Sequence, residues 1–289
     1  MTREQLRELQ KLQLKIALEV KRICEKHDIN YFLDCGSMLG TVRHNGFIPW
    51  DDDMDIGFLR KDYDKFIDVV TEELGEEFYL LTWDNNTEYP QPYAKLCLKD
   101  TIYQEKIIGQ VKNPVNGIFV DLFPYDNISD NKMMRFCNGI VRKLVSHMMM
   151  IKCGYRVWEG KGYVKKLKFF PIIVCSLFFS EESLKRLFNH MAYMYQSVET
   201  EEVGIEDGGI SLYWRYKREN LEEFIQRKFE EADFKIPKDY DVLLKTGYGN
   251  YMELPSEESR WIGHAVEKID FGPYARENVD EKTDNNTCV

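Results

Sequence analysis

The sequence predicts an α+β protein, with a mixed β-sheet core flanked by helices and a helical insertion that is both basic and apolar. Apolar residues recur at helical spacing near the start of the chain, and short apolar runs of strand length follow between residues 31 and 123. Helical patterns then dominate from residue 131 to 203. With 289 residues, of which 44% are hydrophobic, the chain is long enough to bury a full core.

The first predicted element is an amphipathic helix over residues 4–27, where inward-facing side chains recur every three or four positions: Leu6, Leu9, Gln13, Ile16, Val20 and Ile23. Strands of the sheet are expected near residues 31–35, 52–59, 93–99 and 117–123, and a helix over residues 62–75 follows the second of them. Toward the C-terminus we expect a strand near residues 210–217 and a helix over residues 239–246.

A dense group of carboxylates occupies the second predicted strand, in the run Asp51-Asp52-Asp53-Met54-Asp55. Because side chains alternate along a strand, Asp51, Asp53 and Asp55 are expected on one face, with Met54 turned into the core. Carboxylates crowded on one face repel each other, and a hard cation such as Mg²⁺ or Mn²⁺ relieves that repulsion. The alternative is a solvated acidic turn, which the apolar residues around the acids disfavour.

A Gly36-Ser37 pair precedes these acids and is interpreted as a turn after the apolar run 31–33. Glycine tolerates the backbone conformations in which successive N–H groups form a nest for a phosphate. Arg43 lies between this pair and the acids, and its planar guanidinium suits two-point binding of phosphate oxygens. A salt bridge from Arg43 to one of the aspartates is the alternative.

These motifs, together with the run Gly46-Phe47-Ile48-Pro49-Trp50 before the acids, resemble the LicD family of phosphotransferases. The resemblance continues in further blocks in the same order and covers roughly residues 8–272: Ala94-Lys95-Leu96, Ile118 to Pro124, Ile236 to Asp241 and Tyr248 to Met252. It implies a nucleotidyltransferase-like fold. The family commonly has an aspartate where this chain has Asn250, so donor and acceptor contacts at that position stay open.

The resemblance also implies a third carboxylate on a neighbouring strand, and Asp121 fits that place. Asp121 is a lone acid in an apolar run, where an unpartnered buried charge is costly. A cation shared with Asp53 and Asp55 would be its partner, and a cap of a backbone turn near Pro124 is the alternative. Lys95 is a candidate ligand of the leaving-group phosphate, with a surface lysine as the alternative.

Two further residues are candidates for substrate contact. Asp52 belongs to the acidic run, and His264 follows a segment that resembles the C-terminal block of the family. For His264 a structural or substrate-contacting role is favoured over a catalytic one.

Membership of this family implies metal-dependent transfer of a phospho-alcohol, with phosphocholine as first choice, from a CDP-alcohol such as CDP-choline. The acceptor would be a hydroxyl of a cell-surface or lipid-linked glycan, and CMP would be released. Mg²⁺ or Mn²⁺ held by Asp53, Asp55 and Asp121 would bridge the diphosphate, and Asp121 would take the acceptor proton. Two other functions stay open: a nucleotidyltransferase that uses an NTP, and a non-catalytic module that binds glycan or lipid.

We divide the chain accordingly into a nucleotidyltransferase-like catalytic core (1–130), a basic and apolar helical insertion (131–203), the C-terminal part of the catalytic fold (204–275) and a polar, mobile tail (276–289). Between residues 131 and 180 the sequence has ten lysines and arginines and one glutamate, whereas the whole chain has a net charge of −10. The apolar run at residues 169–179 is too short to span a bilayer. Peripheral contact with an anionic membrane is expected, and packing of the insertion on the core is the alternative.

Cysteine usage and charge indicate a cytoplasmic protein. The seven cysteines include no Cys-x-x-Cys pair, which is typical of reduced thiols, and the charged start of the chain lacks the apolar stretch of a signal peptide. The acidic net charge argues against general nucleic-acid binding.

Overall fold

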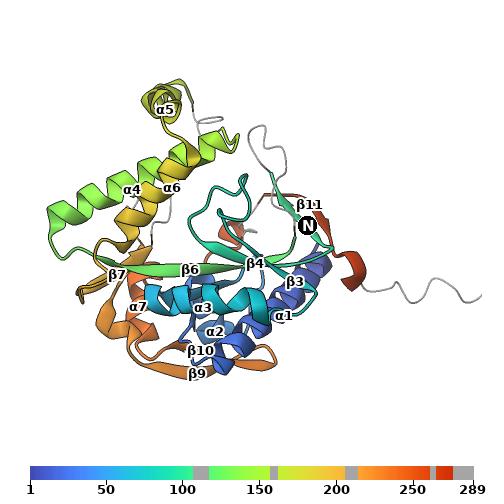
Figure 1. The fold of residues 1–289 in the computed structure, drawn as a ribbon. Coiled ribbons are helices and arrows are strands. Elements are labelled where there is room, and N and C mark those ends of the chain that lie inside the picture. The colour runs from blue at the N-terminus through green and yellow to red at the C-terminus, as the bar shows by residue number, and fades with distance from the viewer. Residues whose placement is uncertain (107–116, 157–161, 206–213, 261–264, 276–289) are drawn as a thin grey trace, which may run out of the picture.

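The computed structural model describes residues 1–106, 117–156, 162–205, 214–260 and 265–275, which form a mixed α+β fold around a curled sheet (Figure 1). The α+β prediction is therefore confirmed. The helices are α1 (Arg3–Lys26), α2 (Cys35–His44), α3 (Arg60–Glu73), α4 (Lys132–Lys152), α5 (Gly162–Ser176), α6 (Glu181–Tyr193) and α7 (Tyr240–Tyr248). The strands are β1 (Phe32–Leu33), β2 (Asp55–Leu59), β3 (Phe78–Leu81), β4 (Ala94–Leu98), β5 (Ile102–Glu105), β6 (Phe119–Ile128), β7 (Glu202–Ile205), β8 (Trp214–Lys217), β9 (Phe224–Phe229), β10 (Ala232–Pro237) and β11 (Val266–Asp270).

The main sheet has the order β1-β2-β6-β4-β3, and β7 and β8 extend it from the far end of β6. Strands β2 and β6 run parallel, whereas β4 pairs with β6 in the antiparallel sense. Strand β6 is ten residues long, so its first half joins the core strands and its second half pairs with β7. Two antiparallel pairs, β9 with β10 and β5 with β11, lie outside this sheet.

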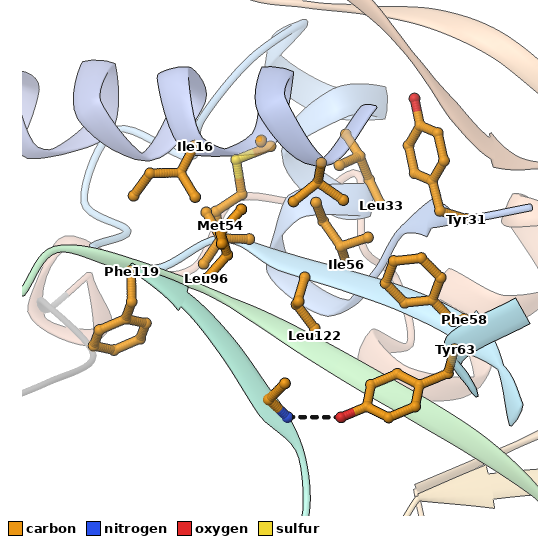
Figure 2. Packing of buried hydrophobic residues seen from close by; sticks show 14 of the residues in the cluster. Ile16, Tyr31, Leu33, Met54, Ile56, Phe58, Tyr63, Leu96, Phe119 and Leu122 are labelled. Carbon is orange, nitrogen blue, oxygen red and sulfur yellow. Dashed lines mark hydrogen bonds between the residues drawn. The ribbon is translucent and has the colours of Figure 1, made fainter. Parts of the chain in front are cut away.

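Helix α1 covers one face of the sheet and supplies much of the core. Its stripe of predicted inward residues is buried as expected, with Leu9, Ile16 and Val20 all at 0% exposure. Figure 2 shows Ile16 facing Met54 and Leu96 of the sheet below it. A capping box between Thr2 and Gln5 defines where the helix begins.

The helices of the insertion lie beyond the opposite side of the sheet (Figure 1) and are tied to it by buried charges. The carboxylate of Asp126 on β6 accepts from Arg60 Nε of α3 at 2.6 Å and pairs with Arg142 of α4 at 2.8 Å. The Arg142 guanidinium also stacks over the Phe188 ring of α6, 4.7 Å from its centroid. One strand residue therefore connects helices on both sides of the sheet.

The structure corrects several sequence-based expectations. The Gly36-Ser37 pair lies in the first turn of α2, not in an isolated turn. The segments of β3, β5 and the β9–β10 hairpin were not predicted as strands. Of the strand expected near residues 210–217, Trp214–Lys217 is present as β8, and the rest lies outside the described residues, as do His264 and the tail 276–289.

The length and apolar character of the helices bear on whether any of them could span a membrane. Within the described ranges, no helix is both long enough and apolar enough to cross a bilayer. The division of the chain at residues 130, 203 and 275 remains a prediction, although helices α4 to α6 all fall between the first two of these boundaries.

The buried charge cluster gives a stability prediction. We expect Asp126→Asn to lower the free energy of unfolding by about 3–5 kcal/mol, because two buried guanidinium groups would lose their counter-charge. Urea unfolding followed by circular dichroism measures this change. The matched control is Glu219→Gln, which removes an ion pair whose side chains are 66% and 68% exposed, and should cost less than about 1 kcal/mol. Equal effects of the two variants would contradict the structural role of Asp126.

Candidate active site

A cavity of about 720 Å³ opens where the first turn of α2, the acidic run and the segment after α7 meet. Asp51, Asp53 and Asp55 all line this cavity, as the alternation of side chains along an extended segment predicts. Met54, between the last two, has 0% exposure in the core. The acids thus lie at the edge of the hydrophobic core and not in a solvated turn.

Helix α2 presents its N-terminal end to this cavity. Its N-cap is Asp34, whose carboxylate accepts from the Cys35 backbone N–H at 2.8 Å. A Cβ atom on Gly36 would lie 2.7 Å from a carboxylate oxygen of Asp51, so a larger residue would displace that acid. Ser37 Oγ accepts from the backbone N–H of Asp55 at 2.9 Å and fixes the start of β2. The Gly-Ser pair therefore contributes through a helix terminus, which also favours anions.

A row of three ionisable side chains crosses the sheet beside this cavity. Asp55 on β2 is paired in register with Asp121 on β6, and Asp121 is paired with Lys95 on β4. Lys95 Nζ lies 2.6 Å from Asp121 Oδ1. Because Lys95 is 8% exposed and Asp121 lies inside a strand, a surface lysine and a turn cap are both excluded.

Burial and repulsion between carboxylates act on the ionisation of Asp55. Burial, reinforced by the carboxylates of Asp53 and Asp121, raises the pKa of Asp55 well above its usual range. A bound cation would reverse this effect, and carboxylate oxygens are ligands that Mg²⁺ and Mn²⁺ accept. In the described part of the chain, no three His, Cys, Asp or Glu side chains are already grouped as metal ligands. The donor set fits a hard cation, and the metal site remains a prediction.

Two glutamines of α1 hold the acidic run in place. Gln10 Nε2 donates to the Asp51 carbonyl at 2.9 Å, and Gln13 Nε2 donates to the Asp52 carbonyl at 2.8 Å. The Asp52 side chain itself is 1% exposed and accepts from the Tyr103 hydroxyl at 2.8 Å. Asp52 is thus placed in the protein interior and does not line the cavity of its neighbours.

The opposite wall of the cavity comes from the C-terminal part of the chain, including Tyr248, Asn250 and Tyr251. Arg43 also lines the cavity, and its guanidinium donates to the Tyr251 carbonyl at 2.8 Å. Burial, followed by the nearby charge of Arg260, lowers the pKa of Arg43. His264 lies outside the described residues, so its predicted substrate contact stays a prediction.

A buried network behind α2 was missed by the sequence analysis. Asp34 has 0% exposure and accepts from the hydroxyls of Tyr125 and Tyr216, and Trp214 Nε1 donates to the Tyr216 hydroxyl at 2.9 Å. Burial raises the pKa of Asp34. The hydrogen-bond partners of Asp34 are distant from it in sequence. The signal that the sequence did contain is an aspartate directly before a helix, which is a common N-cap pattern.

Sequence comparison finds a family match for the part of the chain that carries the site. Residues 28–144 match the family model described as LicD/FKTN/FKRP, nucleotidyltransferase domain, and this range contains α2, the acidic run, Lys95 and Asp121. This stretch of the chain is therefore similar to the LicD-family domain. The LicD resemblance inferred from the motifs is thereby confirmed, while the nucleotidyltransferase-like fold beyond the mixed α+β architecture remains a prediction.

Relatives of known sequence extend the match beyond the LicD domain. The lipopolysaccharide cholinephosphotransferase LicD of Haemophilus influenzae is 28% identical over 271 residues, which cover 91% of this chain and 97% of that enzyme. An uncharacterized protein of Rickettsia prowazekii is 43% identical over 118 residues, or 40% of this chain and 41% of the relative. The cavity wall formed after α7 therefore lies within the region shared with the Haemophilus enzyme.

The raised pKa of Asp55 predicts a gain of stability when its charge is removed. A folded pKa above the unfolded one means that ionised Asp55 lowers stability at neutral pH. We expect Asp55→Asn to raise the free energy of unfolding of the metal-free protein at pH 7, and the gain to shrink as the pH falls toward about 4. Urea unfolding in EDTA at both pH values measures it, with the exposed Asp233→Asn as control. A loss of stability at pH 7 would contradict the electrostatic account.

Proposed function

We propose that this chain is a phosphotransferase that moves phosphocholine from CDP-choline to a hydroxyl of a cell-surface or lipid-linked glycan and releases CMP. The observation that carries the proposal is the match to the Haemophilus cholinephosphotransferase over 97% of its length, combined with a carboxylate row at the cavity. The donor, the cargo and the acceptor are all part of the proposal.

The carboxylates of Asp53, Asp55 and Asp121 would hold Mg²⁺ or Mn²⁺, which when bound neutralises charge on the diphosphate and on the leaving CMP. Asp121 would accept the proton of the attacking glycan hydroxyl. Lys95, 2.6 Å from Asp121, adds a fixed positive charge next to the phosphates. Ser37 holds the backbone of Asp55, and the α1 glutamines hold the backbone just before Asp53, so these two carboxylates would be positioned before the donor arrives.

The cavity offers two further groups for the donor phosphates. The N-terminal end of α2, with Gly36 at its first turn, carries the partial positive charge of a helix terminus. Arg43 lines the same cavity from the last turn of that helix. The volume of about 720 Å³ falls within the range of nucleotide-sized ligand sites. We therefore place the cytidine diphosphate part of the donor there.

We further propose that the enzyme works at the inner face of the cell membrane, in peripheral contact with anionic lipid. Helix α5 lies apart from the sheet (Figure 1), and large apolar side chains at its end and just beyond are exposed, among them Leu177 at 76% and Phe178 at 81%. The basic residues of the same segment complement anionic headgroups. Such contact would bring the cavity to acceptors built on lipid carriers.

The donor and the metal are tested together, without the acceptor, by thermal shift. We expect CDP-choline with Mg²⁺ or Mn²⁺ to stabilise the protein by about 2.7 kcal/mol at a hundredfold excess over Kd, and EDTA to abolish the effect. Asp53→Asn should fold, lose the metal-dependent shift and lose transfer to a glycan acceptor, whereas the exposed Asp233→Asn should keep both. Stabilisation by CTP alone would indicate a nucleotidyltransferase, and retained turnover in Asp53→Asn would refute the metal site.

Membrane contact is tested by co-sedimentation with vesicles. Binding to vesicles that contain anionic phosphatidylglycerol should exceed binding to neutral phosphatidylcholine vesicles and fall with salt. Leu177→Ser combined with Phe178→Ser should weaken it severalfold, because both side chains are exposed and apolar. Val242→Ser on α7, where the side chain is 50% exposed, is the matched control. Unchanged binding of the double variant would refute this surface.

A further inference from the structure

A second cavity, of about 310 Å³, lies on the other side of the carboxylate row. Asp121 and Lys95 line this cavity, whereas Asp53 and Asp55 line the first one. Because Asp55 and Asp121 are neighbours in register on parallel strands, the two cavities meet at this pair. The smaller cavity therefore begins where the donor phosphates are proposed to lie.

Aromatic rings form a large part of the wall of this second cavity. Five of its eleven lining residues are tyrosine or phenylalanine: Tyr89, Tyr93, Tyr103, Phe119 and Tyr155. They come from the segment before β4, from β5 and β6, and from the turn after α4. Phe119 points away from α1 (Figure 2), and Asp121, two positions later in β6, is on the same face because side chains alternate along a strand. The rings therefore gather beside the reacting row.

A cation already occupies the face of one of these rings. Lys95 Nζ lies 3.4 Å from the centroid of the Phe119 ring and 5.8 Å from that of Tyr93. The Phe119 ring is itself held edge to face by Tyr103, at 5.5 Å and 82°. Lys95 thus covers this face of Phe119, so a second cation would be attracted to the other rings of the wall, such as that of Tyr93.

The polar groups of the cavity favour a cation over an anion. Asp121 and Glu105 line it against the single ammonium group of Lys95 among its described lining residues, which leaves a negative balance. Lys95 is paired with Asp121, so its charge is compensated within the wall. In addition, the Tyr89 hydroxyl is buried and has no hydrogen-bond partner in the described structure. The negative balance of these polar groups matches a ligand with a positive head group.

We propose that this second cavity binds the quaternary ammonium end of the transferred phosphocholine, an inference that rests on the proposed function. In this arrangement the cytidine lies in the first cavity, the diphosphate lies at the carboxylate row, and the trimethylammonium group lies against the ring of Tyr93 with Glu105 as its counter-charge. Aromatic walls and a carboxylate recognise such a group by cation–π attraction and apolar contact. A primary ammonium or an uncharged polyol would lose the apolar contacts.

The test compares CDP-alcohols that differ only in the alcohol, with CMP as the compound that lacks the alcohol. Affinities of CDP-choline, CDP-ethanolamine, CDP-glycerol and CMP are measured by calorimetry in Mg²⁺ for the wild type, Tyr93→Leu, Glu105→Gln and Tyr248→Leu. The last variant removes a tyrosine from the first cavity and is the matched control. We expect Tyr93→Leu and Glu105→Gln each to weaken CDP-choline by about fivefold or more, with CMP unchanged. Tyr248→Leu should affect CDP-choline and CMP alike.

The outcomes separate this inference from the function on which it rests. If the wild type binds CDP-choline but neither Tyr93→Leu nor Glu105→Gln changes its affinity, the second cavity is not the choline site, while the phosphotransferase proposal survives. If the wild type prefers another CDP-alcohol or binds none of them, the choline proposal and this inference both fail. Circular dichroism confirms folding of each variant, and Glu105→Gln keeps the test valid if Tyr93→Leu does not fold.

Discussion

Two carboxylates held side by side in a protein interior are the constraint around which this fold is organised. The parallel register of β2 and β6 places Asp55 beside Asp121, and burial makes their repulsion costly. The surroundings offset part of this cost: Lys95 neutralises Asp121, and the Ser37 hydroxyl anchors the backbone of Asp55. The repulsion that remains is what the proposed Mg²⁺ or Mn²⁺ would relieve.

The local features of this site were predictable because they depend on residues close together in sequence. The alternation of side chains in the acidic run predicted that Asp51, Asp53 and Asp55 share one face. Helical periodicity predicted α1 with both of its ends correct to within one residue. The run around Asp121 was predicted as a strand at 117–123, and β6 continues it to Ile128. The resemblance to the LicD family also implied that Asp121 lies on a strand next to the acidic run. Periodicity alone does not predict which strands are neighbours.

The features that were missed depend on contacts between distant segments. Helix α2 contains Gly36 and Gly40, and Cys35 at its start has a φ of 44°, so its local pattern resembles a turn. The aromatic wall of the second cavity draws on residues from 89 to 155, which no single motif connects. Tyr248 and Tyr251, from the C-terminal part of the chain, line the first cavity, which is again a contact between segments far apart in sequence.

Strand β6 carries Asp121 at the reacting row and, five positions later, Asp126 at the junction of two helices. Strand β6 therefore contributes both to the candidate site and to the stability of the fold. A substitution in this strand is expected to affect both. The segment 248–256 lies outside the sheet and contributes to a cavity wall, and of its residues Tyr251 is buried in the core. In an evolving family, changes of donor or acceptor preference are thus expected to accumulate in this segment while β6 varies little.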